Sequence, residues 1–530
     1  MNPTSSGLAS RCAPPSRRAF LRTAGYGTAA AFVASSMLAR LKAAESSGGN
    51  YLTPTDASDD PLFMSATKIA ALIRAKKISA TEAVTLCYKR IDEVNPKLNA
   101  VVFMCRERAF AEAAEADAAL AKGKLKGALH GVPMTIKDSF DTAGVVTTGG
   151  TLGRKSYVPG SDATVVARAR AAGAILLGKS NTPEFTLGGG GKGTLNLVYG
   201  LTRNPYNTSY QPSGSSGGAG AIVAAGGAHF DIGSDYGGSI RGPAYANGIA
   251  GIKPTLGRVP RTGHIVVYGG AFDSFQETGP LARRVEDLTL LMPILSGPDW
   301  SDAAMVPVPL GDPARVDLKK LRIAFYTTNG MMDPTPEVQA LVKQCVGYFS
   351  GLGCAVTEAA PPKMPELSEV RQKYEGANGR DHIRRLLKKH NTQQASPGLR
   401  LDGDVLSSAD FTRLCEEMDA IRSEQLSWFE SYDLIVCPAS QRAPIPLDYE
   451  QPGGREMRGR SSYTSQYNTT GWPAGVVRAG TSTADPGLPL GIQVVAQPWR
   501  DDAVIAALGF IESKTGGFVK PLFATERVPA

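Results

Sequence analysis

Short apolar runs alternate with longer amphipathic stretches over most of the chain. The runs AILLG (174–178), DLIVCP (433–438) and GIQVVA (491–496) have the length and composition of strands buried in a sheet. Residues 66–94 predict one or two amphipathic helices, and the Ala-, Glu- and Arg-rich residues 106–122 predict one largely exposed helix. Because strand and helix patterns alternate along the chain, the predicted fold class is α/β.

By length alone the chain could hold three domains, yet its pattern is continuous. The 530 residues contain no Gly/Ser-rich or Pro-rich linker after residue 60 and no internal repeat. We therefore predict one large domain over residues 66–530, preceded by an N-terminal extension over residues 45–65. Within this domain, residues 364–426 are charged and helical in pattern.

The first 44 residues differ in composition from the rest of the chain. Residues 16–21 read SRRAFL, the pattern of a twin-arginine export signal, and an Ala-rich run follows over residues 23–39. Its Gly, Thr and Ser residues make this run too polar and too short for a membrane span. We predict a signal peptide over residues 1–44, cleaved near Ala43 and Ala44, and a periplasmic or secreted protein exported by the twin-arginine route. The alternative is a disordered basic N-terminus in which the arginine pair is accidental.

The positive charge of the chain belongs to this N-terminal segment. The whole chain carries 57 basic and 49 acidic residues, a formal charge of +8, but six of the basic residues precede the first acid, Glu45. The remainder is nearly balanced at about +2 and has no basic cluster with interleaved aromatic residues. We therefore expect no nucleic-acid partner, no stable membrane anchor, and a monomer or homodimer.

The cysteines and histidines form no metal-binding pattern. The seven cysteines include no CxxC pair, and the five histidines are scattered along the chain. Cys345 and Cys354 are close enough in sequence that a disulfide is conceivable in an oxidising compartment, although burial as small apolar residues is the simpler interpretation. We predict no metal and no cofactor.

The candidate chemistry is concentrated in residues 211–258, which contain two serines beside paired glycines. Ser215 lies in GSSGG, and Ser239 lies in DYGGSIR, 24 residues further on. Glycine has no Cβ, so the backbone there can approach a substrate closely and direct N–H groups at a developing oxyanion. No histidine or acid stands at triad-like spacing, but lysine is an alternative base for a serine nucleophile. Lys137, at the end of the apolar run in HGVPMTIKD, is the candidate base.

These three motifs resemble the amidase signature family. Lys137, Ser215 and Ser239 look like the Lys, cis-Ser and Ser of that family's triad. Further family-like segments follow in the family's order: ARARAAGAILLGKSNTPEF, RNPYN, ETGPLARRVEDL, YDLIVCPAS, NTTGWPAGVV and GLPLGIQVVAQPWRDD. The resemblance covers roughly residue 66 to the C-terminus. It implies a central mixed, twisted β-sheet flanked by helices, with residues 364–426 near the substrate funnel.

The resemblance also implies a role for each residue of the triad. Ser239 attacks the amide carbon, Ser215 relays the proton, and Lys137 accepts it. The peptide bond that precedes Ser215 is cis in the family. A lysine titrates at about 10.4 in water, so Lys137 must be desolvated or hydrogen-bonded to act as a neutral base.

An oxyanion hole is implied beside the nucleophile. Its donors are the backbone N–H groups of Tyr236, Gly237, Gly238 and Ser239. Tyr236 stands where the family usually has a smaller or aliphatic residue, so its side chain is a candidate for contact with the substrate. Ser216 is a weaker candidate for such contact and is also a candidate helix N-cap.

Each residue also has a structural interpretation. Lys137 could be a surface lysine, and Ser215 and Ser239 could cap helices. Asp235 and Arg241 are predicted to pair or cap around the loop and to have no catalytic role.

Only the joint occurrence of the three motifs favours an enzyme. We predict an amidohydrolase that acts on small carboxamides (aryl, alkyl or peptide amides, oligoamides or carbamates), with esters as side substrates. The rival functions are a non-catalytic binding protein of the same fold and a glutamine-amidotransferase-like subunit.

Overall fold

The computed structural model describes residues 58–189, 191–266, 269–450 and 462–521. The predicted signal peptide over residues 1–44 and most of the predicted extension over residues 45–65 lie outside these ranges. Among the described residues, no helix combines the length and the apolar character needed to cross a membrane.

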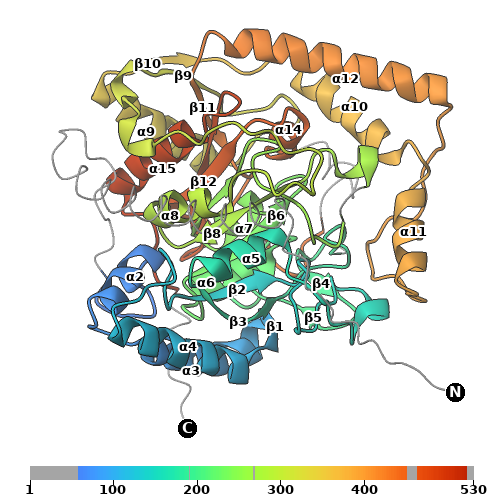
Figure 1. Ribbon diagram of the computed structural model, residues 1–530. Helices are drawn as coiled ribbons and strands as arrows, with labels where there is room; N and C mark the ends of the chain where they lie inside the picture. Colours follow the sequence, from blue (N-terminus) through green and yellow to red (C-terminus); the bar gives the residue numbers. More distant parts are fainter. Residues whose placement is uncertain (1–57, 190, 267–268, 451–461, 522–530) are drawn as a thin grey trace, which may run out of the picture. The chain divides into compact units, whose positions relative to one another are not determined.

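A mixed β-sheet of eleven strands runs through the described part of the chain (Figure 1). The pairs β2–β3, β2–β6, β9–β11 and β9–β10 are parallel, and the other neighbours are antiparallel. From one edge to the other the order is β1 (Val101–Met104), β3 (Ile175–Ser180), β2 (Pro133–Lys137), β6 (Phe230–Asp235), β8 (Glu277–Ala282), β7 (Ala250–Lys253), β12 (Ala474–Thr481), β13 (Pro489–Ala496), β11 (Leu434–Pro438), β9 (Arg322–Phe325) and β10 (Ala355–Glu358). A separate hairpin pairs β4 (Leu195–Asn196) with β5 (Gly200–Leu201).

Helices flank this sheet. The described helices are α2 (Ala66–Arg74), α3 (Ala80–Leu98), α4 (Arg106–Ala121), α5 (Thr164–Ala171), α6 (Gly217–Ala224), α7 (Arg241–Ala246), α8 (Val285–Leu295), α9 (Pro336–Leu352), α10 (Met364–Gly376), α11 (Asp381–Lys389), α12 (Ser408–Phe429), α14 (Ser465–Thr469) and α15 (Asp501–Thr515). Helix α15 packs on β12 and β13, α9 packs on β11, and α4 packs on β3. The predicted α/β class, with one large mixed sheet between helices, is confirmed.

Local sequence accounts for several of these elements. Residues 66–94 form two helices, because the capping box of Ser79 and Glu82 starts a second helix after α2 has ended. The run AILLG falls in β3, whose six residues are all buried. The run GIQVVA falls in β13, whose eight residues are all buried, as expected for strands inside a covered sheet.

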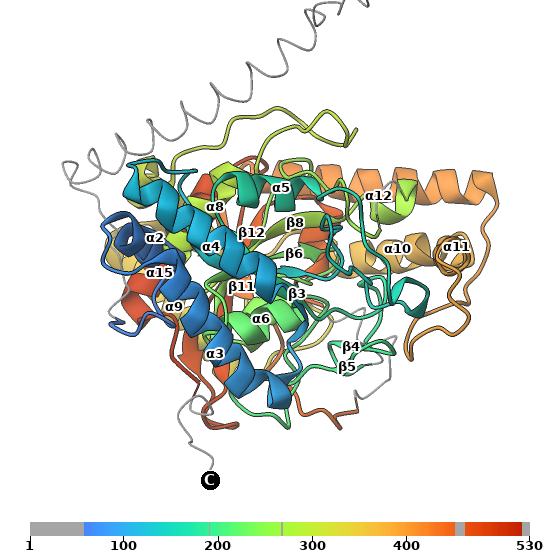
Figure 2. The same cartoon turned by 60° about the horizontal axis from the view of Figure 1, so that its bottom comes forward.

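The predicted helical region over residues 364–426 contains α10, α11 and most of α12. Figures 1 and 2 show these three helices, in orange, lying apart from the blue helices α3 and α4. Apolar side chains of α10 and α12 pack together with Phe275 in one buried cluster. This arrangement leaves the α10–α11 segment beside the loops that follow β6.

Two central strands of the sheet, β2 and β6, each end in a residue of the site. Lys137 is the last residue of β2, and Asp235 is the last residue of β6. Because β2 and β6 are parallel neighbours, both strands end at the same edge. The loop before α6 carries Ser215, and the loop between β6 and α7 carries Ser239.

Candidate active site

Lys137 is fully buried at the end of β2. Its Nζ lies 2.7 Å from the Oγ of Ser215 and 3.0 Å from the Oγ of Ser234. Burial lowers the pKa of Lys137 to about 7, although the nearby carboxylates of Asp235 and Asp231 act in the opposite direction. A substantial fraction of the amine is therefore neutral near neutral pH, and the interpretation of Lys137 as a surface lysine is wrong.

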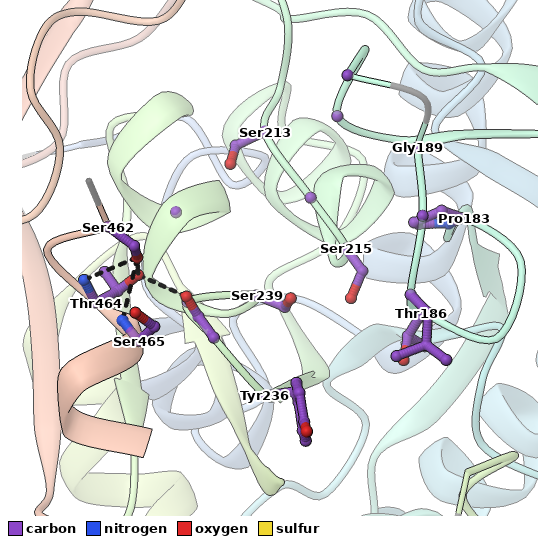
Figure 3. Close-up of a pocket in the computed structure, with 18 of the residues that line it drawn as sticks. Pro183, Thr186, Gly189, Ser213, Ser215, Tyr236, Ser239, Ser462, Thr464 and Ser465 are labelled. Carbon is purple, nitrogen blue, oxygen red and sulfur yellow. Dashed lines mark hydrogen bonds between the residues drawn. The ribbon is translucent and has the colours of Figure 1, made fainter. Parts of the chain in front are cut away.

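Ser215 connects this lysine to the pocket. The Gly214–Ser215 peptide bond is cis, as the family resemblance predicts. The Ser215 side chain is 4% exposed, and its Oγ is the nearest hydroxyl to Lys137. Figure 3 shows the hydroxyls of Ser215 and Ser239 facing one another across the pocket.

Ser239 is partly exposed in the loop between β6 and α7, so a ligand in the pocket can reach its hydroxyl. The carbonyl oxygen of Ser239 accepts a hydrogen bond from the Ser216 N–H at 3.2 Å. This bond ties the two serine loops together. The structure thus brings all three predicted triad residues to one place, although Lys137 lies 78 residues before Ser215 in the chain.

Asp235 and Arg241 hold the loop that carries Ser239. Both side chains are fully buried, and the Arg241 guanidinium donates to both oxygens of the Asp235 carboxylate, at 2.9 and 3.1 Å. The same carboxylate accepts from the N–H groups of Gly238 at 2.7 Å and Ile240 at 3.0 Å. Burial by itself would raise the pKa of Asp235, but the charge and hydrogen bonds of Arg241 hold it well below its usual range. These contacts match the predicted structural role of the pair.

The hydrogen bond from Gly238 corrects one prediction. The Gly238 N–H points to Asp235 and is not directed at the pocket, so it is not a free oxyanion donor. Within the described residues, the N–H groups of Tyr236, Gly237 and Ser239 have no hydrogen-bond acceptor, and all three residues line the pocket. The candidate oxyanion hole is reduced to these three donors.

The prediction that Ser216 contacts the substrate is wrong. Its side chain is fully buried and does not line the pocket, and its Oγ donates to the carbonyl of Ser234 at 3.4 Å. Ser216 does stand at the N-cap position of α6, but its side chain forms no capping hydrogen bond. Its hydroxyl ties the loop before α6 to strand β6.

Two residues at the base of the site, Ser234 and His264, were missed by sequence reasoning. The Nδ1 atom of His264 accepts a hydrogen bond from the Val266 N–H at 3.1 Å, and its Nε2 atom lies within hydrogen-bond distance of the Ser234 hydroxyl, at 3.0 Å. Burial, aided by the charge of Lys137, lowers the pKa of His264 to about 3, so the ring is neutral. Ser234 is therefore held between a neutral imidazole and Lys137. The only sequence signal for it was its place in the strand that leads to Asp235.

A pocket with a volume of about 620 Å³ is lined by Ser215 and Ser239. Tyr236 lines it, as predicted, and its ring packs near Phe275 with a centroid separation of 6.2 Å. Helices α10 and α11, from the 364–426 region, supply part of the wall. Arg371 of α10 donates to the Tyr236 carbonyl at 2.6 Å, and Thr464 donates to the Gly237 carbonyl at 2.7 Å. These two bonds fix the loop from its outer side.

The described part of the chain contains neither a metal-ligating cluster nor a disulfide. Among the described residues, no group of three or more His, Cys, Asp or Glu side chains could hold a metal ion. Cys345 and Cys354 are both unpaired thiols, so the conceivable disulfide between them is not formed. The Sγ of Cys354 instead lies 3.1 Å from the carbonyl of Leu318.

Comparison with known proteins supports the resemblance to the amidase signature family. The sequence model of the amidase family matches residues 82–505. The chain is 33% identical over 487 residues to one of the subunits of glutamyl-tRNA(Gln) amidotransferase from Moorella thermoacetica, and the match covers 86% of this chain and 97% of the relative. Indoleacetamide hydrolase of Bradyrhizobium diazoefficiens is 33% identical over 480 residues, which cover 87% of this chain and 88% of the relative. The solved structure of 6-aminohexanoate cyclic dimer hydrolase complexed with substrate matches with a TM-score of 0.77 and 26% identity, over 87% of this chain and 99% of that one.

The fold and these similarities place the protein among the hydrolases that cleave the C–N bonds of amides. The chain belongs to the amidase signature family.

The Asp235 carboxylate provides a test of the loop geometry. We expect Asp235→Ala to lower the free energy of unfolding by about 3 kcal/mol, because it leaves the buried Arg241 charge without its partner. We also expect it to lower kcat for an amide at least about 100-fold, because the loop that carries the pocket N–H groups loses its anchor. Denaturant melts and steady-state kinetics measure the two effects. The control is Asp433→Ala, which removes a more exposed Asp–Arg pair far along the chain and should change kcat by less than about twofold.

Proposed function

We propose that this protein hydrolyses small carboxamides through an acyl-enzyme formed on Ser239. The observation that carries the proposal is the 2.7 Å contact between the buried amine of Lys137 and Ser215, whose hydroxyl faces Ser239 at an open pocket. A serine hydroxyl becomes a useful nucleophile only when a base removes its proton during attack. Lys137 can supply that base because its pKa lies near 7.

The proposed reaction proceeds in two halves. Ser239 Oγ attacks the amide carbon while its proton passes to Ser215 Oγ, and the Ser215 proton passes to Lys137 Nζ. The oxyanion that forms is stabilised by the N–H groups of Tyr236, Gly237 and Ser239. The relay then runs in reverse and protonates the departing amine. In the second half a water molecule attacks the ester on Ser239 by the same route, which releases the acid and restores the serine.

The substrate class follows in part from the relatives. One relative is named for indoleacetamide, and structural neighbours are named for a cyclic dimer of 6-aminohexanoate and as an aryl acylamidase, so alkyl, oligomeric and aryl amides are all in range. Carbamates and esters use the same acyl-enzyme chemistry and are proposed as further substrates. The rival interpretation is a glutamine-dependent amidotransferase component, because one relative belongs to glutamyl-tRNA(Gln) amidotransferase. Hydrolysis of glutamine in preference to other amides would favour this rival.

Covalent labelling tests the nucleophile directly. We expect a fluorophosphonate probe to modify Ser239 because its hydroxyl is the activated one, and peptide mapping by mass spectrometry locates the label. Ser239→Ala should lose labelling and lose at least about 1000-fold in kcat for an amide. The matched control is Ser213→Ala, which removes another serine from the pocket wall. It should keep both the labelling of Ser239 and the wild-type kcat. Amide hydrolysis by Ser239→Ala at the wild-type rate would refute the proposal.

The pH dependence tests the base. Because Lys137 must be neutral, kcat/KM should rise about tenfold per pH unit below its pKa of about 7 and level off above it. Lys137→Met should abolish this activity.

The same variant has a defined effect on stability. The pKa of Lys137 falls from 10.5 to about 7 on folding, so the unfolded chain binds more protons between these values, and stability should rise with pH across this window. Lys137→Met removes this dependence and should melt at or above the wild-type temperature at pH 6. An active Lys137→Met, or a flat kcat/KM profile between pH 5 and 8, would contradict the assignment.

We also propose that residues 1–44 direct export by the twin-arginine route, which makes the protein periplasmic or secreted. The support is the SRRAFL sequence followed by the weakly apolar run over residues 23–39.

Replacement of Arg17 and Arg18 by lysine tests this targeting. We expect the double variant to remain in the cytoplasm as an uncleaved precursor, because the export machinery reads the arginine pair. Immunoblots of cell fractions measure the distribution. Arg22→Lys, which leaves the pair intact, is the control and should be exported normally. Normal export of the double variant would count against the twin-arginine route.

A further inference from the structure

The wall of the pocket carries an unbalanced positive charge. Its ionised side chains are four arginines and one glutamate, Arg371, Arg380, Arg400, Arg442 and Glu375. The rest of the chain after the predicted signal peptide is close to neutral. The charge is therefore a local property of this wall.

Two of these five charged side chains, Arg371 and Glu375, are paired with one another. Arg371 forms an ion pair of 2.9 Å with Glu375. Its remaining nitrogens donate to the carbonyls of Ser465 and Tyr236 and to the hydroxyl of Thr469. Arg371 is thus a structural residue that braces the loop after β6, and Glu375 is its counter-ion.

Arg380 is in a different position. Arg380 is the N-cap residue of α11, is half-buried and lines the pocket. Its Nε atom is buried and has no hydrogen-bond acceptor. Among the residues that the structure describes, no ion pair or hydrogen bond engages its guanidinium. A buried donor without an acceptor is costly, so a ligand that supplies one gains the hydrogen bond and removes that cost.

A second arginine, Arg400, adds to the positive charge of the pocket wall near Arg380. Arg400 lines the same pocket and is exposed. Burial lowers the pKa of Arg380, the charge of Glu375 raises it, and the like charge of Arg400 lowers it further. Two guanidinium groups that repel one another at the wall of a substrate pocket are stabilised when an anion binds between them.

We propose that Arg380, assisted by Arg400, binds a carboxylate of the substrate, so that the preferred substrates are amides with a carboxylate several atoms from the scissile bond. This inference rests on the proposed function of Ser239. The planar fork of a guanidinium presents two parallel N–H groups that match the two oxygens of a carboxylate. The positive wall also attracts an anionic substrate during its approach.

Two matched pairs of anilides test the proposal. Glutaryl-4-nitroanilide and pentanoyl-4-nitroanilide differ by a carboxylate on the acyl side. The pair 4-butanamidobenzoate and 4-methylbutananilide differs by a carboxylate on the amine side. The wild-type protein should prefer the carboxylate member of at least one pair by about tenfold or more in kcat/KM. Raised ionic strength should reduce this preference.

Three variants locate the preference. Arg380→Gln should remove it while kcat/KM for the neutral member stays within about threefold, and Arg380→Lys should retain part of it, because the charge is kept and the fork is lost. The control is Arg385→Gln in the same helix, since Arg385 is 67% exposed, pairs with Asp381 and does not line the pocket. It should keep the full preference.

The outcomes separate this inference from the proposed function. Absence of a preference in both wild-type pairs, an undiminished preference in Arg380→Gln, or an equal loss on both members of a pair would each overturn the carboxylate subsite while leaving amide hydrolysis intact. Failure of Ser239 as nucleophile would instead appear as unchanged turnover by Ser239→Ala. When Ser239→Ala is inactive, as the proposed function expects, calorimetry with glutaryl-4-nitroanilide on this variant measures carboxylate binding without turnover, and adding Arg380→Gln should weaken the binding about tenfold.

Discussion

A lysine without access to water is the constraint on which the site depends. Lys137 ends β2 inside the sheet, and the free energy cost of a buried ammonium lowers its pKa to about 7. The amine is nevertheless well supplied with hydrogen-bond partners, since Ser215 and Ser234 lie within 3.0 Å of Nζ. His264 in turn hydrogen-bonds Ser234, and the two hydroxyls that contact the amine are neutral groups that hold it in place without fixing its charge.

The second requirement is that the loop carrying Ser239 keeps its shape. Asp235 meets this requirement by accepting hydrogen bonds from the loop's own N–H groups and from Arg241. Arg241 also reaches Gln493 of β13 and Asn468 of α14. Segments that lie more than 200 residues further along the chain therefore help to hold the turn. A buried pair of this kind is stable only when all its hydrogen-bonding groups have partners, and here they come from three separate elements.

The proposed chemistry and the proposed choice of substrate depend on different parts of the fold. Lys137, Ser215 and Ser239 lie on or beside the central strands, where packing on both faces keeps them in place. The arginines that line the pocket come largely from α10, α11 and the segment that follows them. Substitutions of Arg380 or Arg400 would change the charge of the wall at positions outside the sheet, as the proposed carboxylate subsite requires.

Much of this protein was determined by local sequence patterns. Apolar runs predicted buried strands, and the motifs around Lys137, Ser215 and Ser239 identified the residues that the fold brings together, because strand burial and glycine turns are properties of neighbouring residues. Three features were decided only by tertiary structure: the donation of the Gly238 N–H to Asp235, the burial of Ser216 away from the pocket, and the chain from His264 through Ser234 to Lys137. Each depends on which side chains from distant segments meet at one point, and that is set by how the sheet and helices pack. No spacing along the chain records it.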